Sequence, residues 1–210
     1  MKICGLTVAD EAVAAAEAGA DAIGFVLAPS PRRVAPARAR EIAARLPQGV
    51  LRVGVFVSPP PEEVEQAMAW IGLDLAQIHG VFPPEGWRRL GGSAIRGVRV
   101  GRDRPEASLI EGGPRFLLLD TYRPEQEGGT GQSFDWLEAR AYRELGRPLL
   151  VAGGLTPANV QAALAAAGPD GVDVSSGVET SPGRKDPALV AAFVAAVREW
   201  ERDRERRRGT

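Results

Sequence analysis

The sequence predicts a closed (β/α)8 barrel, the TIM barrel fold, with a phosphate site at the carboxyl-terminal face of its strands. Strand-like and helix-like segments alternate along the 210 residues with mostly short connections, which favours parallel strands joined by right-handed crossovers. The last two predicted strands run into the glycine-rich ends Gly153-Gly154 and Ser175-Ser176-Gly177. Barrels of this type commonly bind phosphate in the loops after their last two strands.

Eight strand–helix units, taken in order, support this fold. Short apolar runs bounded by glycine, proline or polar residues are predicted strands, and the stretches between them are predicted helices. Gly19 ends the first helix, Pro47 closes the second, and Glu62 and Glu63 place acidic groups in the first turn of the third. The predicted strands are residues 2–5, 22–27, 51–57, 73–78, 94–100, 115–120, 149–152 and 171–174. The predicted helices are residues 8–18, 37–46, 62–71, 84–90, 104–110 (a poor candidate), 134–145, 157–167 and 186–204, with a helical turn at 178–180.

An open, doubly wound sheet is the alternative architecture. We rank it below the barrel because no G-x-G-x-x-G fingerprint follows the first predicted strand, and because both glycine-rich ends lie near the C-terminus. The length suits one domain with a sizeable core, so we expect a single domain over residues 1–210. The charged residues 199–210 are expected to form a solvated helix end that frays into a tail.

The composition argues against several functions. The net charge of −1 does not favour nucleic acid or an anionic membrane as a partner. No apolar run is as long as a membrane span, and the N-terminal residues lack the apolar region of a signal peptide. The single cysteine excludes an intrachain disulfide and suits the reducing cytoplasm. We expect no cofactor, because the sequence contains neither a metal-ligand cluster nor a P-loop.

Three of the predicted strand ends carry side chains that can move protons, namely Cys4, His79 and Asp120. Active-site residues of such barrels stand at the carboxyl ends of the strands. Because side chains alternate along a strand, Cys4 shares the inner face with Lys2, and Asp120 points towards the barrel mouth. The same count places Asp173 on the inner face of the last strand, beside the first. We therefore expect a Lys2–Asp173 ion pair, since neither charge is tolerated alone in a barrel interior.

Each of these candidates also has a structural interpretation. A lone cysteine is commonly a small buried apolar residue, although Lys2 on the same face favours the thiolate of Cys4. An aspartate that ends a strand is commonly a helix N-cap. Asp120 instead precedes a long loop containing GGTG at 128–131, which we interpret as a lid. His79, the only histidine, is about as readily a structural residue as a substrate contact.

Two loops suggest contacts with other molecules. Arg32 and Arg33 follow the second predicted strand, where a solvated surface pair is the default. An arginine turned into the mouth would instead suit a carboxylate. The Pro- and Val-rich loop at 55–61 could form an apolar contact patch for a homodimer, but the sequence does not decide between monomer and dimer.

Short motifs mark most of the strand ends. They are KICG at 2–5, GFV at 24–26, SPR at 30–32, VGVFV at 53–57, QIHG at 77–80, LLLD at 117–120, GGTG at 128–131, AGGLTPANV at 152–160 and GVDVSSGVETSPGRKD at 171–186. Together they resemble the phosphoribosylanthranilate isomerase family, in order and with family-like spacing, from residue 2 to about residue 197. KICG and the final segment are highly specific as a set. The arginine-rich tail and the short region after the fifth strand are less usual for the family.

The resemblance implies an enzyme of tryptophan synthesis that converts N-(5-phosphoribosyl)anthranilate to 1-(2-carboxyphenylamino)-1-deoxyribulose 5-phosphate. The reaction would be an Amadori rearrangement. Asp120 would be the general acid that opens the ribose ring, and Cys4 the general base that removes the C2′ proton. Arg32 would contact the anthranilate, and His79 would line the same mouth. Backbone amides near Gly154, Ser176 and Gly177 would hold the phosphate, and Gly129, Gly153, Asp173 and Ser175 complete the candidate substrate-binding set.

Two other functions compete with this one. Indole-glycerol-phosphate synthase is a related barrel, but the family is lysine-dependent, and here Lys2 lies at the wrong depth and Lys185 is expected outside the barrel. A non-catalytic phosphate-ligand-binding barrel would keep the same site without turnover. Anthranilate fluorescence discriminates these possibilities, because only a catalyst would make it decay beyond stoichiometric quenching.

Overall fold

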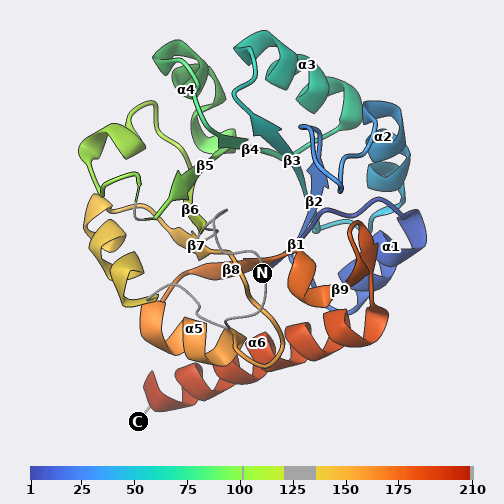
Figure 1. Cartoon of the computed structure of the whole chain (residues 1–210), viewed down its shortest axis with the longest axis vertical. Helices are drawn as coiled ribbons and strands as arrows, with labels where there is room; N and C mark the ends of the chain where they lie inside the picture. The colour runs from blue at the N-terminus through green and yellow to red at the C-terminus, as the bar shows by residue number, and fades with distance from the viewer. Residues whose placement is uncertain (101, 121–135, 209–210) are drawn as a thin grey trace.

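Eight parallel strands form a closed barrel in the order β1 to β8, as the sequence predicts. The structure, a computed structural model, describes residues 1–100, 102–120 and 136–208. Figure 1 looks along the barrel and shows the helices arranged around it. β1 and β8 close the barrel, where Lys2 pairs with Asp173. The strands are β1 Lys2–Cys4, β2 Ala22–Val26, β3 Leu51–Val57, β4 Leu75–His79, β5 Ala94–Arg99, β6 Phe116–Asp120, β7 Leu149–Val151 and β8 Gly171–Val174.

Helical segments follow the strands and cover the outside of the barrel. Several begin at proline. N–H groups in the first turn of a helix have no partner within the helix, so proline loses nothing by lacking one, and its φ is already helical. Gly72 ends α3 with a φ of 80°, a left-handed conformation that glycine adopts without strain. The helical segments are α1 Ala9–Glu17, α2 Pro36–Arg45, α3 Pro61–Ile71, α4 Pro84–Leu90, η1 Gly91–Ser93, η2 Ala107–Ile110, η3 Trp136–Leu145, α5 Val160–Ala167, η4 Ser176–Val178 and α6 Pro187–Arg208, where η denotes a 3-10 helix.

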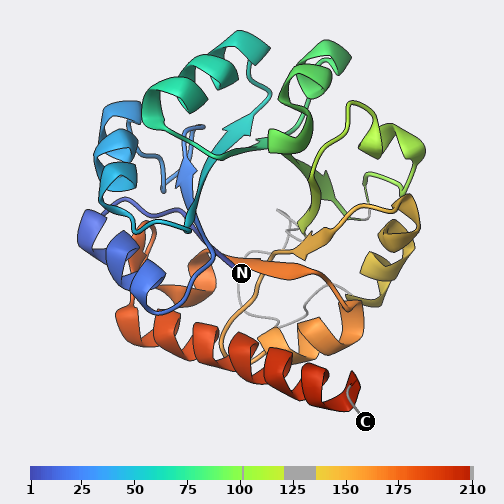
Figure 2. The same ribbon diagram turned by 180° about the vertical axis from the view of Figure 1, so that it is seen from behind.

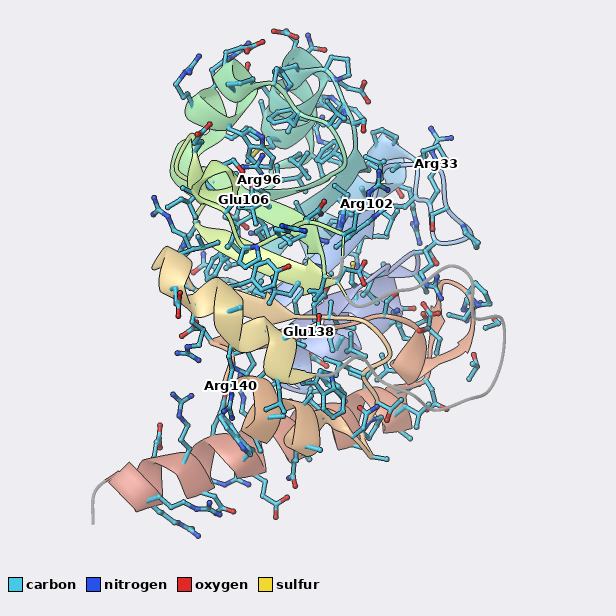
Figure 3. The ribbon with its side chains drawn as sticks, turned by 60° about the vertical axis from the view of Figure 1, so that its left-hand side comes forward. Arg33, Arg96, Arg102, Glu106, Glu138 and Arg140 are labelled. Carbon is cyan, nitrogen blue, oxygen red and sulfur yellow. The ribbon has the colours of Figure 1, made fainter. Side chains whose placement is uncertain are left out.

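The long helix α6 covers the junction of the first and last units. It packs against both α1 and α5, which Figure 2 shows from behind the barrel. Its buried side chains include Phe193, and burying a side chain of this size contributes about 1.5–3 kcal/mol. Beside α5, Arg140 of η3 donates its Nε–H to the carbonyl of Ala166 at 2.8 Å (Figure 3). Among the described residues, no helix combines the length and apolarity needed to cross a bilayer.

The strands alternate between an outer and an inner core. On β1, Ile3 joins the large cluster between the barrel and its helices, so Lys2 and Cys4 face inwards. A separate apolar cluster fills the lower part of the barrel, and polar side chains lie above it towards the carboxyl ends of the strands. The lower cluster consists of Ala22, Val53, Leu75, Ile95, Leu118 and Ala152.

Several predicted boundaries were wrong. Residues 178–180 were expected to form a helical turn, but the turn is η4 and the next residues form β9 Glu179–Ser181, paired antiparallel with β10 Arg184–Lys185. α5 begins at Val160 rather than residue 157, because the side-chain Oδ1 of Asn159 accepts the Thr156 N–H at 2.7 Å and so stabilises a preceding turn.

Other differences concern helix type and length. The described part of the predicted helix 134–145 is the 3-10 segment η3. The poor candidate at 104–110 is reduced to η2. α6 continues to Arg208, so residues 199–208 are helical instead of fraying from the predicted end at 204. Within the predicted apolar loop 55–61, Val55 and Phe56 are buried, while Val57 is 51% exposed.

Candidate active site

Cys4 faces the interior of the barrel, as predicted. Its side chain is buried at the carboxyl end of β1, beside Gly24 of β2. A Cβ added at Gly24 would lie 2.8 Å from the Sγ of Cys4 and 3.0 Å from Cε of Lys2. The glycine therefore makes room for both side chains inside the barrel.

The predicted ion pair between Lys2 and Asp173 is present. Nζ of Lys2 lies 2.9 Å from Oδ1 of Asp173, and both side chains are buried. Burial opposes the charge on Lys2, but Asp173 and Cys4 together raise the pKa of the ammonium group above its usual value. Lys2 is therefore a fixed cation directly below Cys4 on the same strand face.

The groups around Cys4 have opposing effects on the pKa of its thiol. Burial raises the pKa of the thiol, and the carboxylate of Asp173 adds to the rise. The ammonium groups of Lys2 and Lys185 oppose it. Lys2 thus acts in the predicted direction by favouring the thiolate, but burial outweighs it, so Cys4 holds its proton more tightly than an ordinary thiol.

His79 lies at the end of β4 and faces the interior. Gln77, two residues earlier on the same face, donates its Nε2–H to Nε2 of His79 at 2.8 Å, which requires the ring proton on Nδ1. A Cβ at Gly97 of β5 would lie 2.4 Å from Nδ1 of the ring, so glycine is needed beside it. Burial lowers the pKa of His79, although Asp120 opposes the fall, and the neutral ring is therefore favoured.

Asp120 ends β6 on the same face as these groups. Its register partner on β5 is Arg99, and it interacts electrostatically with His79 and Asp173. Asp173 in turn interacts with Cys4. A continuous set of interacting charged and titratable groups therefore runs inside the barrel from the thiol on β1 to the carboxyl on β6. Gln77 and Arg99 were not identified from the sequence, although alternation along β4 and β5 places both on the same inner face as His79.

The glycine-rich ends of β7 and β8 lie against each other, as a shared phosphate site requires. Gly153 and Gly154 have φ values of 86° and 63°, which allow the chain to turn sharply after β7. A Cβ at Gly177 would fall 1.8 Å from the carbonyl oxygen of Leu155, so the start of η4 packs directly on the turn after β7. Ser175 donates its Oγ–H to the carbonyl of Cys4 at 3.1 Å, which joins this end to β1.

The two arginines after β2 differ in orientation. Arg33 is exposed on the loop (Figure 3). Arg32 is turned in, with its guanidinium bound to the carboxylate of Glu179 at 2.7–3.0 Å and 24% of its side chain exposed. Its stem lies over the residue that follows the thiol, because a Cβ at Gly5 would be 2.8 Å from Cδ of Arg32.

Lys185 lies outside the barrel, as predicted, on the separate two-stranded sheet of β9 and β10, but it is buried against the end of β8. Its side chain is 1% exposed, and its Nζ lies 2.7 Å from Oε1 of Glu179 and 3.1 Å from the carbonyl of Ser175. The hairpin of β9 and β10 folds it back over the end of β8. Glu179 itself was not identified from the sequence. The Pro182-Gly183 turn between two short polar runs was the available signal for the hairpin.

The remaining predicted features lie outside the described residues. These are Gly129, the rest of the GGTG motif and the loop after Asp120 that we interpreted as a lid. Within the described part of the chain, His, Cys, Asp and Glu side chains form no group of three or more that could hold a metal ion.

Side chains that can gain or lose a proton lie at the carboxyl ends of a closed parallel barrel, an arrangement typical of (β/α)8-barrel enzymes. The family model described as N-(5'phosphoribosyl)anthranilate (PRA) isomerase matches residues 1–196. N-(5'-phosphoribosyl)anthranilate isomerase of Rubrobacter xylanophilus is 49% identical over 204 residues, covering 94% of this chain and 98% of the relative. The chain therefore belongs to the N-(5'-phosphoribosyl)anthranilate isomerase family, and it is an isomerase.

Solved structures agree with this assignment. Phosphoribosyl anthranilate isomerase from Thermus thermophilus superposes with a TM-score of 0.82 at 40% identity, covering 94% of this chain and 98% of that one. Another phosphoribosyl anthranilate isomerase, solved in complex with reduced 1-(o-carboxyphenylamino)-1-deoxyribulose 5-phosphate, has a TM-score of 0.79 at 35% identity and covers 94% and 97% of the two chains.

Proposed function

We propose that this chain converts N-(5-phosphoribosyl)anthranilate to 1-(2-carboxyphenylamino)-1-deoxyribulose 5-phosphate, with Asp120 as general acid and Cys4 as general base. The isomerase activity is that of the family, and the step belongs to tryptophan biosynthesis. The observation that carries the assignment of roles is the inward position of Cys4 on β1, connected through Asp173 and His79 to Asp120 on β6.

The first step is the opening of the ribose ring. Asp120, protonated in the substrate complex, donates its proton to the ring oxygen, and the C1′–O bond breaks as the anilino nitrogen supplies an electron pair. The product of this step is a protonated Schiff base. His79, neutral because burial lowers its pKa, lines the same mouth and adds no second positive charge there.

The second step is the removal of the C2′ proton. The thiolate of Cys4 takes the proton, and the C2′ electron pair neutralises the Schiff base to give an enolamine, which tautomerises to the ketone. Lys2 and Lys185 both favour the thiolate against the effect of burial. One proton leaves Asp120 and one arrives at Cys4, so the overall reaction is an isomerisation without net proton uptake.

Binding at the two ends of the substrate would place the sugar between these groups. Backbone amides near Gly154, Ser176 and Gly177 would hold the phosphate, with Gly153 and Ser175 shaping the two strand ends. Arg32 would receive the anthranilate carboxylate, as a planar guanidinium suits a carboxylate. The β7 and β8 ends lie between β1 and β6 around the barrel, so a phosphate there leaves the sugar within reach of both strands.

The fluorescence of the anthranilate group tests this function. Freshly prepared substrate should lose its signal in a first-order decay at catalytic enzyme concentration, over many turnovers. A binding protein without activity would quench no more than one equivalent of ligand. That outcome would support the alternative of a non-catalytic phosphate-ligand-binding barrel.

The structure gives a further reason to disfavour the lysine-dependent chemistry of indole-glycerol-phosphate synthase. Lys185 does lie near the mouth, but its ammonium is bound to Glu179 as that of Lys2 is bound to Asp173. Burial lowers the pKa of Lys185, although Glu179 opposes the fall. Each amine is held by its carboxylate, so neither is placed to attack a substrate as a nucleophile.

We also propose the setting in which the enzyme works. A homodimer is proposed because one solved relative, at 36% identity, is described as monomers generated from the dimeric phosphoribosylanthranilate isomerase of Thermotoga maritima. Light scattering on a size-exclusion column measures the mass in solution.

The cytoplasm is the proposed compartment because the mechanism needs a reduced thiol at Cys4. Neither nucleic acid nor a membrane is a proposed partner, and residues 1–210 are proposed to act as one domain.

A further inference from the structure

One buried carboxylate is shared by two cations at the edge of the site. Oε1 of Glu179 accepts hydrogen bonds from Nζ of Lys185 at 2.7 Å and from Nε of Arg32 at 2.9 Å. Oε2 accepts from the terminal nitrogen of Arg32 at 2.7 Å, and the backbone N–H of Gly183 donates to Oε1 at 3.2 Å. The side chains of Glu179 and Lys185 are 4% and 1% exposed, so solvent does not substitute for these contacts.

The cluster carries a net positive charge, because one carboxylate faces an ammonium and a guanidinium. Burial opposes ionisation of Glu179, but hydrogen bonds from Arg32 and Lys185 hold the pKa of its carboxyl below the usual value. Buried ion pairs contribute little to stability compared with well-packed apolar residues, because desolvation offsets their attraction. The cluster is therefore better explained by the geometry that it imposes than by the stability that it adds.

That geometry concerns Arg32 and the strand end next to the thiol. Glu179 engages the guanidinium of Arg32, whose stem crosses Gly5 directly after Cys4. Lys185 holds the other side of the carboxylate and also donates to the carbonyl of Ser175, whose hydroxyl donates to the carbonyl of Cys4. The same contacts thus set the guanidinium, the end of β8 and the end of β1 relative to one another.

We propose that Glu179, held by Lys185, is a positioning residue that orients Arg32 to receive the anthranilate carboxylate. The inference rests on the proposed function, which assigns that carboxylate to Arg32. Glu179 restricts a long flexible side chain to one orientation before the substrate arrives, so less conformational entropy is lost on binding. Without Glu179, Arg32 would still be charged but would no longer be held in place.

Two ligands separate positioning from general support of the fold. The first is reduced 1-(o-carboxyphenylamino)-1-deoxyribulose 5-phosphate, and the second is the same compound made from aniline, which lacks the carboxylate. We expect Glu179→Gln to weaken binding of the first by about tenfold or more, the scale of a charge-assisted contact, and to leave the second within about twofold. In turnover, KM should rise while kcat changes little, because the proton-transferring groups are untouched. Lys185→Met should show the same selectivity between the two ligands, but its kcat should also fall, because Lys185 favours the thiolate of Cys4.

The matched control is Arg184→Gln. Arg184 lies on the same hairpin, is 62% exposed and pairs with Glu11 instead of Glu179, so both ligands should bind as they do to the wild type.

Arg32→Met should lose the same selectivity between the two ligands as Glu179→Gln, and the double variant should lose no more than either single one. If Glu179→Gln does not fold by circular dichroism, Glu179→Asp keeps the charge at a shorter reach and should show a smaller selective loss.

Two outcomes would overturn the inference. Equal weakening of both ligands by the Glu179 variant would assign the residue to the scaffold, and unchanged binding of both would give it no role. These outcomes differ from failure of the proposed function, in which the wild type would fail to turn over substrate or would bind the two ligands equally well.

Discussion

Nζ of Lys2 lies 2.9 Å from Oδ1 of Asp173, inside the barrel, at the pairing of the first and last strands. The two side chains are 3% and 8% exposed, so water screens their attraction only slightly. The pair therefore connects the closure of the barrel to the charge environment of Cys4. The carboxylate of Asp173 also interacts electrostatically with Asp120 and His79, so the ion pair affects the charge environment on the opposite side of the barrel as well.

Removal of one partner of this pair should be costly. We predict that Lys2→Met or Asp173→Asn alone lowers the free energy of unfolding by about 3–5 kcal/mol, because each leaves its partner buried without compensation. The double variant should lose clearly less than the sum, as measured by urea unfolding. Arg38→Gln is the control, because the pair of Arg38 with Glu41 is 46% and 64% exposed and should contribute at most about 1 kcal/mol. Strict additivity of the two single losses would contradict the prediction.

Loss of either proton-transferring group should abolish most of the turnover. We predict that Cys4→Ala and Asp120→Asn each reduce kcat by about 10²–10⁴-fold, the usual contribution of a general acid or base, with unchanged circular dichroism. Asp10→Asn is the control, because this aspartate is 82% exposed on α1 and pairs with Arg45 instead of a group inside the barrel. Wild-type kcat in either active-site variant would show that the role was assigned to the wrong residue.

The pH profile should carry the signature of a buried thiol. A general base acts unprotonated, and kcat/KM reports the ionisations of the free enzyme. Because burial raises the pKa of Cys4, we expect kcat/KM to increase with pH to a midpoint above the ordinary thiol value of about 8.5. Lys2→Met removes a cation that opposes the rise, so its midpoint should move further up, whereas Arg38→Gln should not move it. A wild-type midpoint below the ordinary thiol value would refute this expectation.

A methyl group at Gly177 should disturb the proposed phosphate site. The added Cβ would lie 1.8 Å from the carbonyl oxygen of Leu155, so the start of η4 must move away from the turn after β7. We predict that Gly177→Ala weakens the binding of inorganic phosphate and of the substrate by about tenfold or more, the loss expected for one or two amide contacts. The control is Gly92→Ala, whose Cβ would meet nothing within 4 Å. Isothermal titration with phosphate measures the effect, and equal affinity in the two variants would argue against the site.

Features that depend on local periodicity were predictable. The alternation of strands and helices defined the barrel, and the two-residue period of β1 placed Lys2 and Cys4 on one face. The Lys2–Asp173 pair was predictable because a closed barrel puts its first and last strands side by side. Residues far apart in the sequence are therefore neighbours. Family resemblance added chemical roles to positions that the strand ends had already selected.

The sequence by itself therefore determined the barrel, its closure, and a thiol and carboxyl at its inner strand ends, because hydrophobic period and strand order are encoded in neighbouring residues. Only the tertiary structure decided that Glu179 joins Arg32, 147 positions away, to Lys185 at the edge of the mouth. It also decided that Gly97, which has no side chain, leaves room for the ring of His79, and that Gly177 packs on Leu155. The contacts of Glu179 and Gly177 depend on how loops fold over the strand ends, and no periodic pattern in the sequence encodes that path. The contact of Gly97 with His79 depends on the register of β5 against β4.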